Sequence, residues 1–487
     1  MSRLTLIISG SIGFMKRLKD FLTSTIDSRS LGLFRIVIGL SLVYNIIFQR
    51  LAYVGTLINN ERLIPHQVID DYYGAPIPLF RLFASDIWSY GYLIVLLLLA
   101  VGFTVGKLSW WLRFLTFVLF GIVNASYTYL SHGPEFLIET ALFWSVLLPV
   151  NISFVLGNTN KSRSINSMVV TGFYIQLFLI YVSSWLLKDG AVWRSDQVME
   201  TLVHERIHAT ELLKNLEGSI DLLRGFTAIG FWLEVIVSIL ILVAIKIKRV
   251  RLVTAVSILI LHTTMILLLS VGHFWSIGLA FSCLFIPSMI YKNQLISYTR
   301  NDRKLSCFKT IFLGILVLFI LHGNLFAWKK QGYLSDVIDS IPLSEVLLKS
   351  HYKDPGMASG FYHQSWRFFS GDIPPDLGDF VYVGIDENGI EYELISGKKL
   401  DAINDFEFTK NDYHHAEFVF AVYLKFYQER FPEPSLKEWL RIQVGENPTE
   451  KAYNQYKLYH HKKTFTVNQP ININDELIEL VTLSMEK

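Results

Sequence analysis

The sequence predicts a polytopic α-helical membrane protein of about nine spans, followed by a C-terminal extramembrane α+β domain. Two observations support this fold class. Of the 487 residues, 52% are hydrophobic and only 18% are charged, whereas soluble domains have about 25% charged residues. The charge is also uneven, because 44 charged residues lie in 1–328 and 42 in the much shorter segment 329–487. The first segment therefore has the composition of a membrane region, and the second that of a water-soluble domain.

Net charge and cysteine content argue against two other classes. A net charge of +2 gives no field strong enough to hold nucleic acid, so we expect no nucleic-acid partner. The basic residues lie between apolar runs, where they set membrane topology instead. Cys283 and Cys307 lie in or beside apolar segments, so we expect no disulfide framework.

The N-terminal segment 1–30 is predicted to lie on the membrane surface. Its apolar start, residues 4–14, has no small-residue cleavage site and is followed by Lys16, Arg17 and Lys19, which is not the pattern of a cleaved signal peptide. Apolar residues recur at helical spacing over 14–28. This pattern predicts an interfacial amphipathic helix.

Nine apolar segments, each of roughly 20 residues, define a transmembrane domain over 31–328. The loops on one side of these spans carry 18 Lys and Arg residues, and the longer loops on the other side carry eight. The positive-inside rule therefore places the N-terminus in the cytoplasm and the domain 329–487 on the non-cytoplasmic side. The predicted spans are 31–49, 88–106, 110–130, 136–156, 167–187, 226–246, 251–271, 273–291 and 308–328.

The tail is predicted to fold as a small α+β domain. Apolar segments at 380–385 and 390–394 flank the dipeptide Asn388-Gly389, which is a strong signal for a β-hairpin. Prolines separate two short helical patterns. These patterns occupy 417–429 and 436–442.

Ionisable side chains inside membrane spans are costly and are functional candidates by default. Several lie toward the non-cytoplasmic side, where the long loops and the tail also lie, and this indicates one site near the outer leaflet. The structural alternative is that the glutamates pair with Arg35 or cap helices, and that the histidines bind backbone groups. The candidates are Arg35, Glu139, Glu234, His262 and His322 within spans, and His132, Lys188 and His273 at span ends.

Lys188 closes the span 167–187, directly after Trp185, Leu186 and Leu187. Desolvation in an apolar wall disfavours the charged ammonium, and a neutral amine can act as a general base. The neighbouring Asp189 opposes this effect, because an anion favours the ammonium. The alternative is a lysine that anchors the end of a span at the membrane interface.

Residues 204–208 read His-Glu-Arg-Ile-His, which has the form HExxH. On a helix, His204 and His208 would share one face and could bind zinc, while Glu205 would activate water. A third ligand is missing from the pattern, because Glu211 is too near and Glu234 lies in a span. The alternative is an amphipathic surface helix over 197–216 that contains two histidines by chance.

Five blocks resemble a known family. They are SLGLFRIVIGL at 30–40, SHGPEF at 131–136, FWLE at 231–234, His262 followed by Gly272-His273-Phe274, and QSWRFF at 364–369. They are similar to blocks of the horizontally transferred transmembrane (HTTM) domain, a family that includes the vitamin K-dependent gamma-glutamyl carboxylases. The resemblance covers roughly 30–300 and resumes at 361–395.

The most specific block runs from Tyr181 to Asp196. It resembles, without a gap, the carboxylase segment that contains a Lys-Lys pair and then a tryptophan. Lys188 falls on the second lysine, the catalytic base of that family, and Trp193 falls on the tryptophan. The resemblance implies that Lys188 and His132 are catalytic. It also implies that Trp193, His262 and Glu234 bind the cofactor.

The resemblance implies a reduced vitamin K-type quinol as cofactor, with O2 and CO2 as co-substrates, and an exported peptide or protein as substrate. Leu187 and Val192 depart from the family pattern, Arg367 stands where the carboxylases have an acidic residue, and the tail is shorter than a full carboxylase's. Two other functions therefore stay open. One is a non-catalytic HTTM scaffold or maturation partner for an exported peptide, and the lesser one is a zinc hydrolase that uses His204 and His208.

Overall fold

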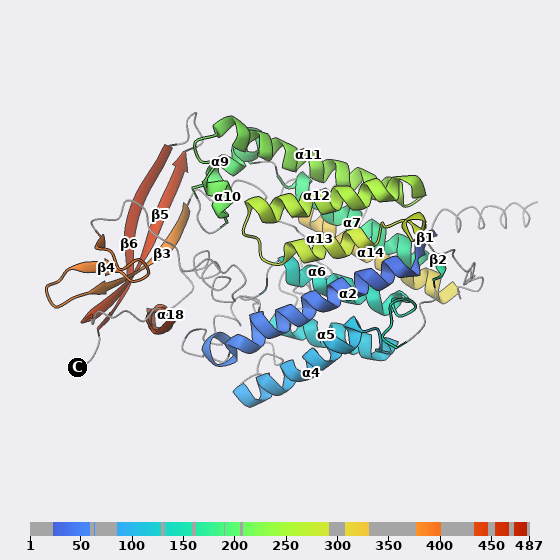
Figure 1. The fold of residues 1–487 in the computed structure, drawn as a ribbon, viewed down its shortest axis with the longest axis horizontal. Coiled ribbons are helices and arrows are strands. Elements are labelled where there is room, and N and C mark those ends of the chain that lie inside the picture. Colours follow the sequence, from blue (N-terminus) through green and yellow to red (C-terminus); the bar gives the residue numbers. More distant parts are fainter. Residues whose placement is uncertain are drawn as a thin grey trace, which may run out of the picture.

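The computed structural model shows a bundle of helices with a β-sheet at one end (Figure 1). The helices run roughly along the long axis of the molecule, and the sheet formed by the C-terminal part of the chain lies beyond their ends. The residues that the structure describes are 23–58, 63, 85–127, 131, 133–157, 162–188, 190–204, 208–291, 307–330, 376–400, 433–446, 453–466 and 472–484.

Every predicted span contains one helix of the bundle. Within the described residues, five helical segments are long and apolar enough to cross a membrane: Ser28–Ile58, Asp86–Thr104, Met168–Leu186, Ile220–Ala244 and Lys248–Leu268. Shorter apolar helices accompany them, so the prediction of a membrane-embedded helical protein is confirmed at this level. The helices are α2 (Ser28–Tyr44, continued by η1 Asn45–Arg50, η2 Leu51–Tyr53 and η3 Val54–Ile58), α4 (Asp86–Thr104), α5 (Trp110–Ser126), α6 (Gly133–Leu147), α7 (Met168–Leu186), α11 (Ile220–Ala244), α12 (Arg251–Leu268), α13 (Phe274–Cys283) and α14 (Cys307–Lys330).

Two helices are shorter than the spans predicted for them. Helix α6 ends at Leu147, just before Pro149, because the residue before a proline is disfavoured in a helix. Helix α13 likewise ends at Cys283, four residues before Pro287. Two buried arginines, Arg35 and Arg113, bind the carbonyl groups that follow the end of α6. Arg35 therefore binds backbone carbonyls, which does not support the alternative in which Glu139 or Glu234 pairs with it.

The predicted N-terminal helix over 14–28 is contradicted at its end. Residues Ser24–Asp27 form a strand, β1, that pairs antiparallel with β2, Ser164–Ser167. The Asp27 side chain accepts a hydrogen bond from the Arg29 backbone and so caps α2. Residues 1–22 lie outside the described part of the chain, so this region tests only the last residues of that prediction.

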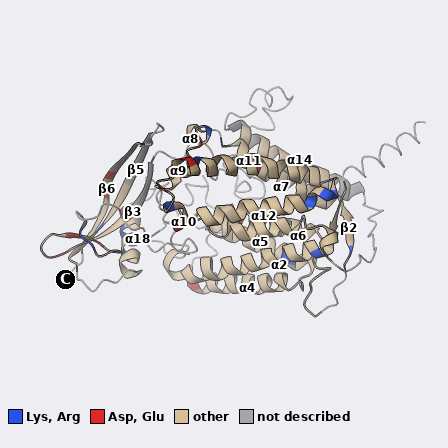
Figure 2. Ribbon diagram, turned by 45° about the horizontal axis from the view of Figure 1, so that its top comes forward, with Lys and Arg blue, Asp and Glu red and all other residues tan. Residues whose placement is uncertain are grey.

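The bundle has a basic end, which lies next to β1 and β2. Figure 2 shows Lys and Arg gathered at that end of the bundle, whereas the C-terminal sheet lies at the opposite end. Arg251 donates a hydrogen bond to the Ala244 carbonyl at 3.1 Å, and Lys246 donates to the Thr23 carbonyl at 3.0 Å. These side chains therefore bind carbonyls at the end of α11 and at the start of β1.

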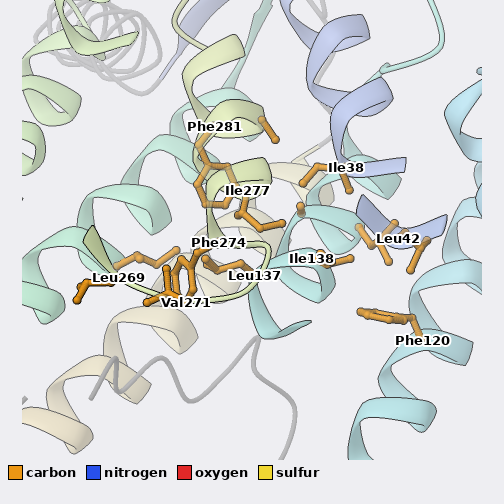
Figure 3. Close-up of a cluster of buried hydrophobic side chains, with 14 of the residues drawn as sticks. Ile38, Leu42, Phe120, Leu137, Ile138, Leu269, Val271, Phe274, Ile277 and Phe281 are labelled. Carbon is orange, nitrogen blue, oxygen red and sulfur yellow. The ribbon is translucent and has the colours of Figure 1, made fainter. Parts of the chain in front are cut away.

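The core of the bundle is apolar and is shared by several helices. Figure 3 shows Leu137 of α6 beside Phe274, while Phe120 of α5 lies beside Leu42 of α2. All four side chains are at most 6% exposed. Helix α6 therefore lies at the centre of this group, with α13 on one side and α2 and α5 on the other.

The C-terminal sheet is antiparallel, with strand order β4-β3-β5-β6. The predicted hairpin is confirmed: Gly389 has a φ of +76° in the turn, and Asp386 Oδ1 accepts hydrogen bonds from the backbone of Asn388 and Ile390. The helix predicted at 436–442 lies within α18, whereas 417–429 lies outside the described residues. The elements are β3 (Asp376–Ile385), β4 (Glu391–Glu393), α18 (Glu433–Glu446), β5 (Gln455–Thr466) and β6 (Asn472–Ser484).

Candidate functional site

Lys188 forms a buried ion pair with Glu234. The helix α7 ends at Leu186, and the Lys188 backbone N–H donates to the Trp185 carbonyl at 3.2 Å. Lys188 Nζ lies 2.6 Å from both carboxylate oxygens of Glu234 on α11. The two side chains are only 7% and 8% exposed. The pair therefore brings one basic and one acidic group into direct contact inside the bundle.

Trp193 completes the surroundings of the Lys188 amine. It lies on the short helix α8 (Ala191–Arg194), and Lys188 Nζ is 4.5 Å from the centre of its ring. A cation above the face of an indole ring is stabilised by the ring's electrons. Lys188 is therefore not the solvated membrane anchor of the structural alternative, and its anionic partner is Glu234. Asp189, which we expected to influence it, lies outside the described residues.

His262 is held in place from three sides. Its Nε2 atom is 3.0 Å from the hydroxyl of Tyr181 on α7, and its ring stacks on Phe274 with an interplanar angle of 20°. On a third side is Gly278 of α13, where a β-carbon would overlap the imidazole ring. The absence of a side chain at Gly278 therefore lets α13 pack directly on His262.

These side chains line one cavity of about 90 Å³ between α7, α9 (Val198–Leu202), α11 and α12. This is space for several water molecules or one small ring. Four sequence-predicted residues meet in it: Lys188, Trp193, Glu234 and His262. Most of the remaining wall is apolar. It includes Leu137, Ile180, Met199, Leu202, Phe226, Leu261, Met265, Leu269, Phe274 and Phe281.

The sequence reasoning missed Tyr181 and the residues of α9. Tyr181 precedes Lys188 by seven residues, which is two helical turns, so a search for polar residues on the same face of α7 would have found it. Helix α9 is different, because its Val198, Met199 and Leu202 carry no chemical signal in the sequence. They reach the cavity wall only because the loop after α7 folds back onto α11, where the Met199 N–H donates to Thr227 Oγ1 at 3.0 Å.

The other sequence-predicted candidates lie elsewhere or are not described. His132 lies outside the described residues, although its neighbour Ser131 accepts a hydrogen bond from Arg50 at 2.9 Å. His322 lies on α14. Glu139 and His273 belong to a second buried polar cluster, which involves α2, α5, α6 and α13 and is treated under the further inference.

The single helix predicted over 197–216 is wrong. The chain forms α9 and then a separate short helix α10 (Glu211–Lys214), with Ala209 paired to Leu269 between them. His204 Nδ1 lies 3.2 Å from Glu217, and His208 follows residues outside the described part of the chain. Within the described residues, no group of three or more His, Cys, Asp or Glu could hold a metal ion. The HExxH alternative therefore gains no support.

Comparison of the chain with protein-family models, with curated proteins and with solved structures finds no match. The chemistry of the cavity must therefore be argued from its own side chains. Its features are a neutral Lys–Glu pair, an indole face, a Tyr–His pair and an otherwise apolar wall.

Proposed function

We propose that this chain is a membrane-embedded, quinol-dependent enzyme of the carboxylase type within the HTTM group, with Lys188 as the proton acceptor. One observation carries the proposal: Lys188, Trp193, Glu234 and His262, which come from three separate segments of the sequence, line the same cavity. A few polar groups that converge in an otherwise apolar cavity are typical of a binding or active site. The family resemblance assigns a role to each of these residues independently of their contacts.

The cavity fits the ring of a quinol in its chemistry. Trp193, Phe226 and Phe274 offer aromatic surfaces, and the neutral Lys–Glu pair adds no net charge that would favour an anionic ligand. A neutral, flat ring with a weakly acidic hydroxyl suits such a wall, because apolar and aromatic contacts bind the ring and the few polar groups orient it. The volume of about 90 Å³ matches the head ring better than a whole lipid-tailed quinone.

Lys188 and Glu234 would work as one unit in proton transfer. The pair holds one proton, and a hydroxyl proton taken up by Lys188 Nζ leaves it with two protons and one positive charge. The Trp193 ring, 4.5 Å from Nζ, stabilises that charge. Tyr181 and His262 offer a second hydrogen-bonding group in the same wall. Lys188 accepts the hydroxyl proton as the neutral amine, which requires the proton of the pair to lie on Glu234, and the hydroxyl becomes the oxyanion that balances the new ammonium charge. A bound quinol would supply the acidic hydroxyl and the reducing electrons, with O2 and CO2 as co-substrates.

The proposed topology places the cavity near the non-cytoplasmic surface. The basic end of the bundle faces the cytoplasm by the positive-inside rule, and nine spans take the C-terminal sheet to the other side. Lys188 follows the end of α7 that is distant from β2, so it lies in the half of the bundle nearer the sheet. An exported peptide or protein could then reach the cavity from the side where the sheet lies.

A reconstituted assay tests this proposal. Full-length protein in nanodiscs is given a reduced naphthoquinone, oxygen, labelled carbon dioxide and a glutamate-containing peptide. Quinone epoxide and incorporated label are then measured. We expect Lys188→Met to lower both rates by about 10²–10⁴-fold, the usual contribution of a general base. Lys214→Met is the matched control, because Lys214 pairs with an exposed glutamate on α10.

Two outcomes would contradict the proposal. Equal rates for the wild type and Lys188→Met would remove Lys188 from the chemistry. A folded wild-type protein that forms neither product across a panel of quinones and peptides would favour the non-catalytic scaffold.

A further inference from the structure

Glu139 is a carboxyl group buried in the middle of α6, only 2% exposed. Its Oε2 atom accepts one hydrogen bond, from Asn124 Nδ2 on α5 at 3.3 Å. Among the described residues, no Lys, Arg or His side chain forms an ion pair with it. Burying an unpaired carboxylate away from water costs roughly several kcal/mol. A buried carboxyl group is therefore either paired with a cation or protonated. Glu139 has only a neutral partner.

The cations and other titratable groups on neighbouring helices are directed elsewhere. Arg35 of α2 and Arg113 of α5 donate to backbone carbonyls beyond the middle of α6. On α7, Tyr174 donates to the Leu284 carbonyl and Tyr181 faces His262. Against Glu139 itself lies Gly121 of α5, where a β-carbon would be 3.1 Å from Oε1. The buried Arg50 on η1 donates to Ser131 at 2.9 Å, so among the described residues no cation forms an ion pair with the Glu139 carboxyl.

A second carboxyl lies one helical turn earlier on the same face of α6. Glu135 Oε1 accepts a hydrogen bond from Asn45 Nδ2 at 2.9 Å and lies 3.5 Å from His273 Nε2. Asn45 is fully buried, and within the described residues its Oδ1 atom has no hydrogen-bond partner. Asn124 Nδ2 also lies 3.5 Å from the Glu135 carbonyl. Asn124 therefore links the Glu139 carboxyl to the backbone carbonyl of Glu135.

This cluster is separate from the Lys188 cavity. Residues four apart on a helix share a face, so Glu135 and Glu139 point to the same side of α6. Leu137, two residues from each, points away from them and lines the cavity beside Phe274 (Figure 3). Helix α6 thus has the cavity on one face and the two carboxyls on the other.

We propose that Glu139, Glu135 and His273 form a second acid–base site, whose ligand is the proton. Glu139 carries one proton at neutral pH, and Glu135 Oε1 lies 3.5 Å from His273 Nε2. Nothing is oxidised or reduced, and the proton moves only between these groups and water. This inference is independent of the quinol chemistry. It concerns different residues, and it depends on a buried carboxyl that has no positively charged partner among the described residues.

Infrared spectroscopy of the full-length protein in nanodiscs tests this inference. A protonated buried carboxyl has a carbonyl absorption that shifts in D2O and is distinct from that of a carboxylate. We expect this band in the wild type at neutral pH, its loss in Glu139→Gln, and its retention in Glu234→Gln. Asn124→Leu removes the one side-chain donor to the Glu139 carboxyl among the described residues, so we expect the band to persist at higher frequency.

Proton counting tests the Glu139 proton. A pH-indicator dye reports protons released as the solution is made alkaline, and we expect Glu139→Gln to release about one proton fewer than the wild type. The inference is overturned if the wild type lacks the carboxyl band, or if Glu139→Gln or Asn124→Leu leaves it unchanged. Equal proton release by Glu139→Gln and the wild type would also overturn it. None of these readouts uses a quinol, so they are independent of the enzyme assay.

Discussion

At the scale of single residues, the Lys188–Glu234 pair is the least replaceable contact in the cavity. Its side chains are 7% and 8% exposed, and removing one partner of a buried pair leaves an uncompensated charge. We expect Glu234→Leu to lower the free energy of unfolding by about 3–5 kcal/mol. Adding Lys188→Met to that variant should recover most of the loss. The measurement is denaturant unfolding of the protein in detergent.

The Lys214–Glu211 pair is the matched control for this prediction. Glu211 is 79% exposed, and an exposed pair contributes only about 0–1 kcal/mol. If Glu234→Leu proved as harmless as Glu211→Gln, the buried pair described above would not exist in the folded protein.

Gly278 is the second residue on which the site depends. Because a β-carbon there would overlap the His262 ring, Gly278→Ala should displace the imidazole and destabilise the protein by about 1–3 kcal/mol. Gly225→Ala on α11 is the control, since nothing lies within 4 Å of its β-carbon position. That change should stabilise the helix by about 0.5–1 kcal/mol. Thermal melting compares the two, and equal effects would contradict the packing of α13 on His262.

At the scale of elements, the sequence reasoning located helices better than strands. Long apolar runs predicted every helix of the bundle, because a membrane span needs many consecutive apolar residues. Strand β1 was missed because four residues carry no periodicity, and it forms only by pairing with β2, far away in the chain. Strands β5 and β6 were missed too, since charged residues such as Lys457 and Glu479 interrupt their apolar patterns.

Those charged residues give the C-terminal sheet a predicted pH dependence. Hydrogen bonds from Thr482 Oγ1 at 2.7 Å and from Lys457 hold the pKa of Glu479 below its ordinary value of 4.5. A carboxyl whose pKa is lower in the folded than in the unfolded state stabilises the fold at a pH above the unfolded-state pKa. This stabilisation is lost as the pH falls through the folded-state pKa. Glu479→Gln should therefore melt below the wild type at neutral pH, with the difference shrinking in acid. A difference independent of pH would contradict this.

At the scale of the whole molecule, the bundle has a basic end and an opposite end that carries the sheet (Figure 2). The proposed topology predicts that these ends lie on different sides of the membrane. In a variant without Cys283 and Cys307, single cysteines replace Lys248 at the basic end or Lys398 near the sheet. An impermeant maleimide added to intact cells should label only Lys398→Cys. Labelling of both, or of Lys248→Cys alone, would contradict the topology.

The convergence of the site could be predicted only in part. The sequence indicated that Lys188, Glu234 and His262 are costly groups in apolar segments, and resemblance added Trp193. Their contacts depend on how α7, α11 and α12 pack against one another, and no local pattern in the sequence reveals that packing. The same limit explains why the Glu135–His273 pair was missed, since its members lie on α6 and before α13.

We propose that the cavity beside Lys188 and Glu234 binds a quinol ring, and an equilibrium binding measurement is the direct test of this role. A tritiated naphthoquinone is titrated, under reducing conditions, into full-length protein in nanodiscs. Leu202 is fully buried in the cavity wall, so Leu202→Trp should fill the cavity, whereas Leu222→Trp changes an exposed position on α11. We expect saturable binding to the wild type and Leu222→Trp, and its loss in a folded Leu202→Trp variant. Equal binding by all three proteins would show that the naphthoquinone does not bind in this cavity.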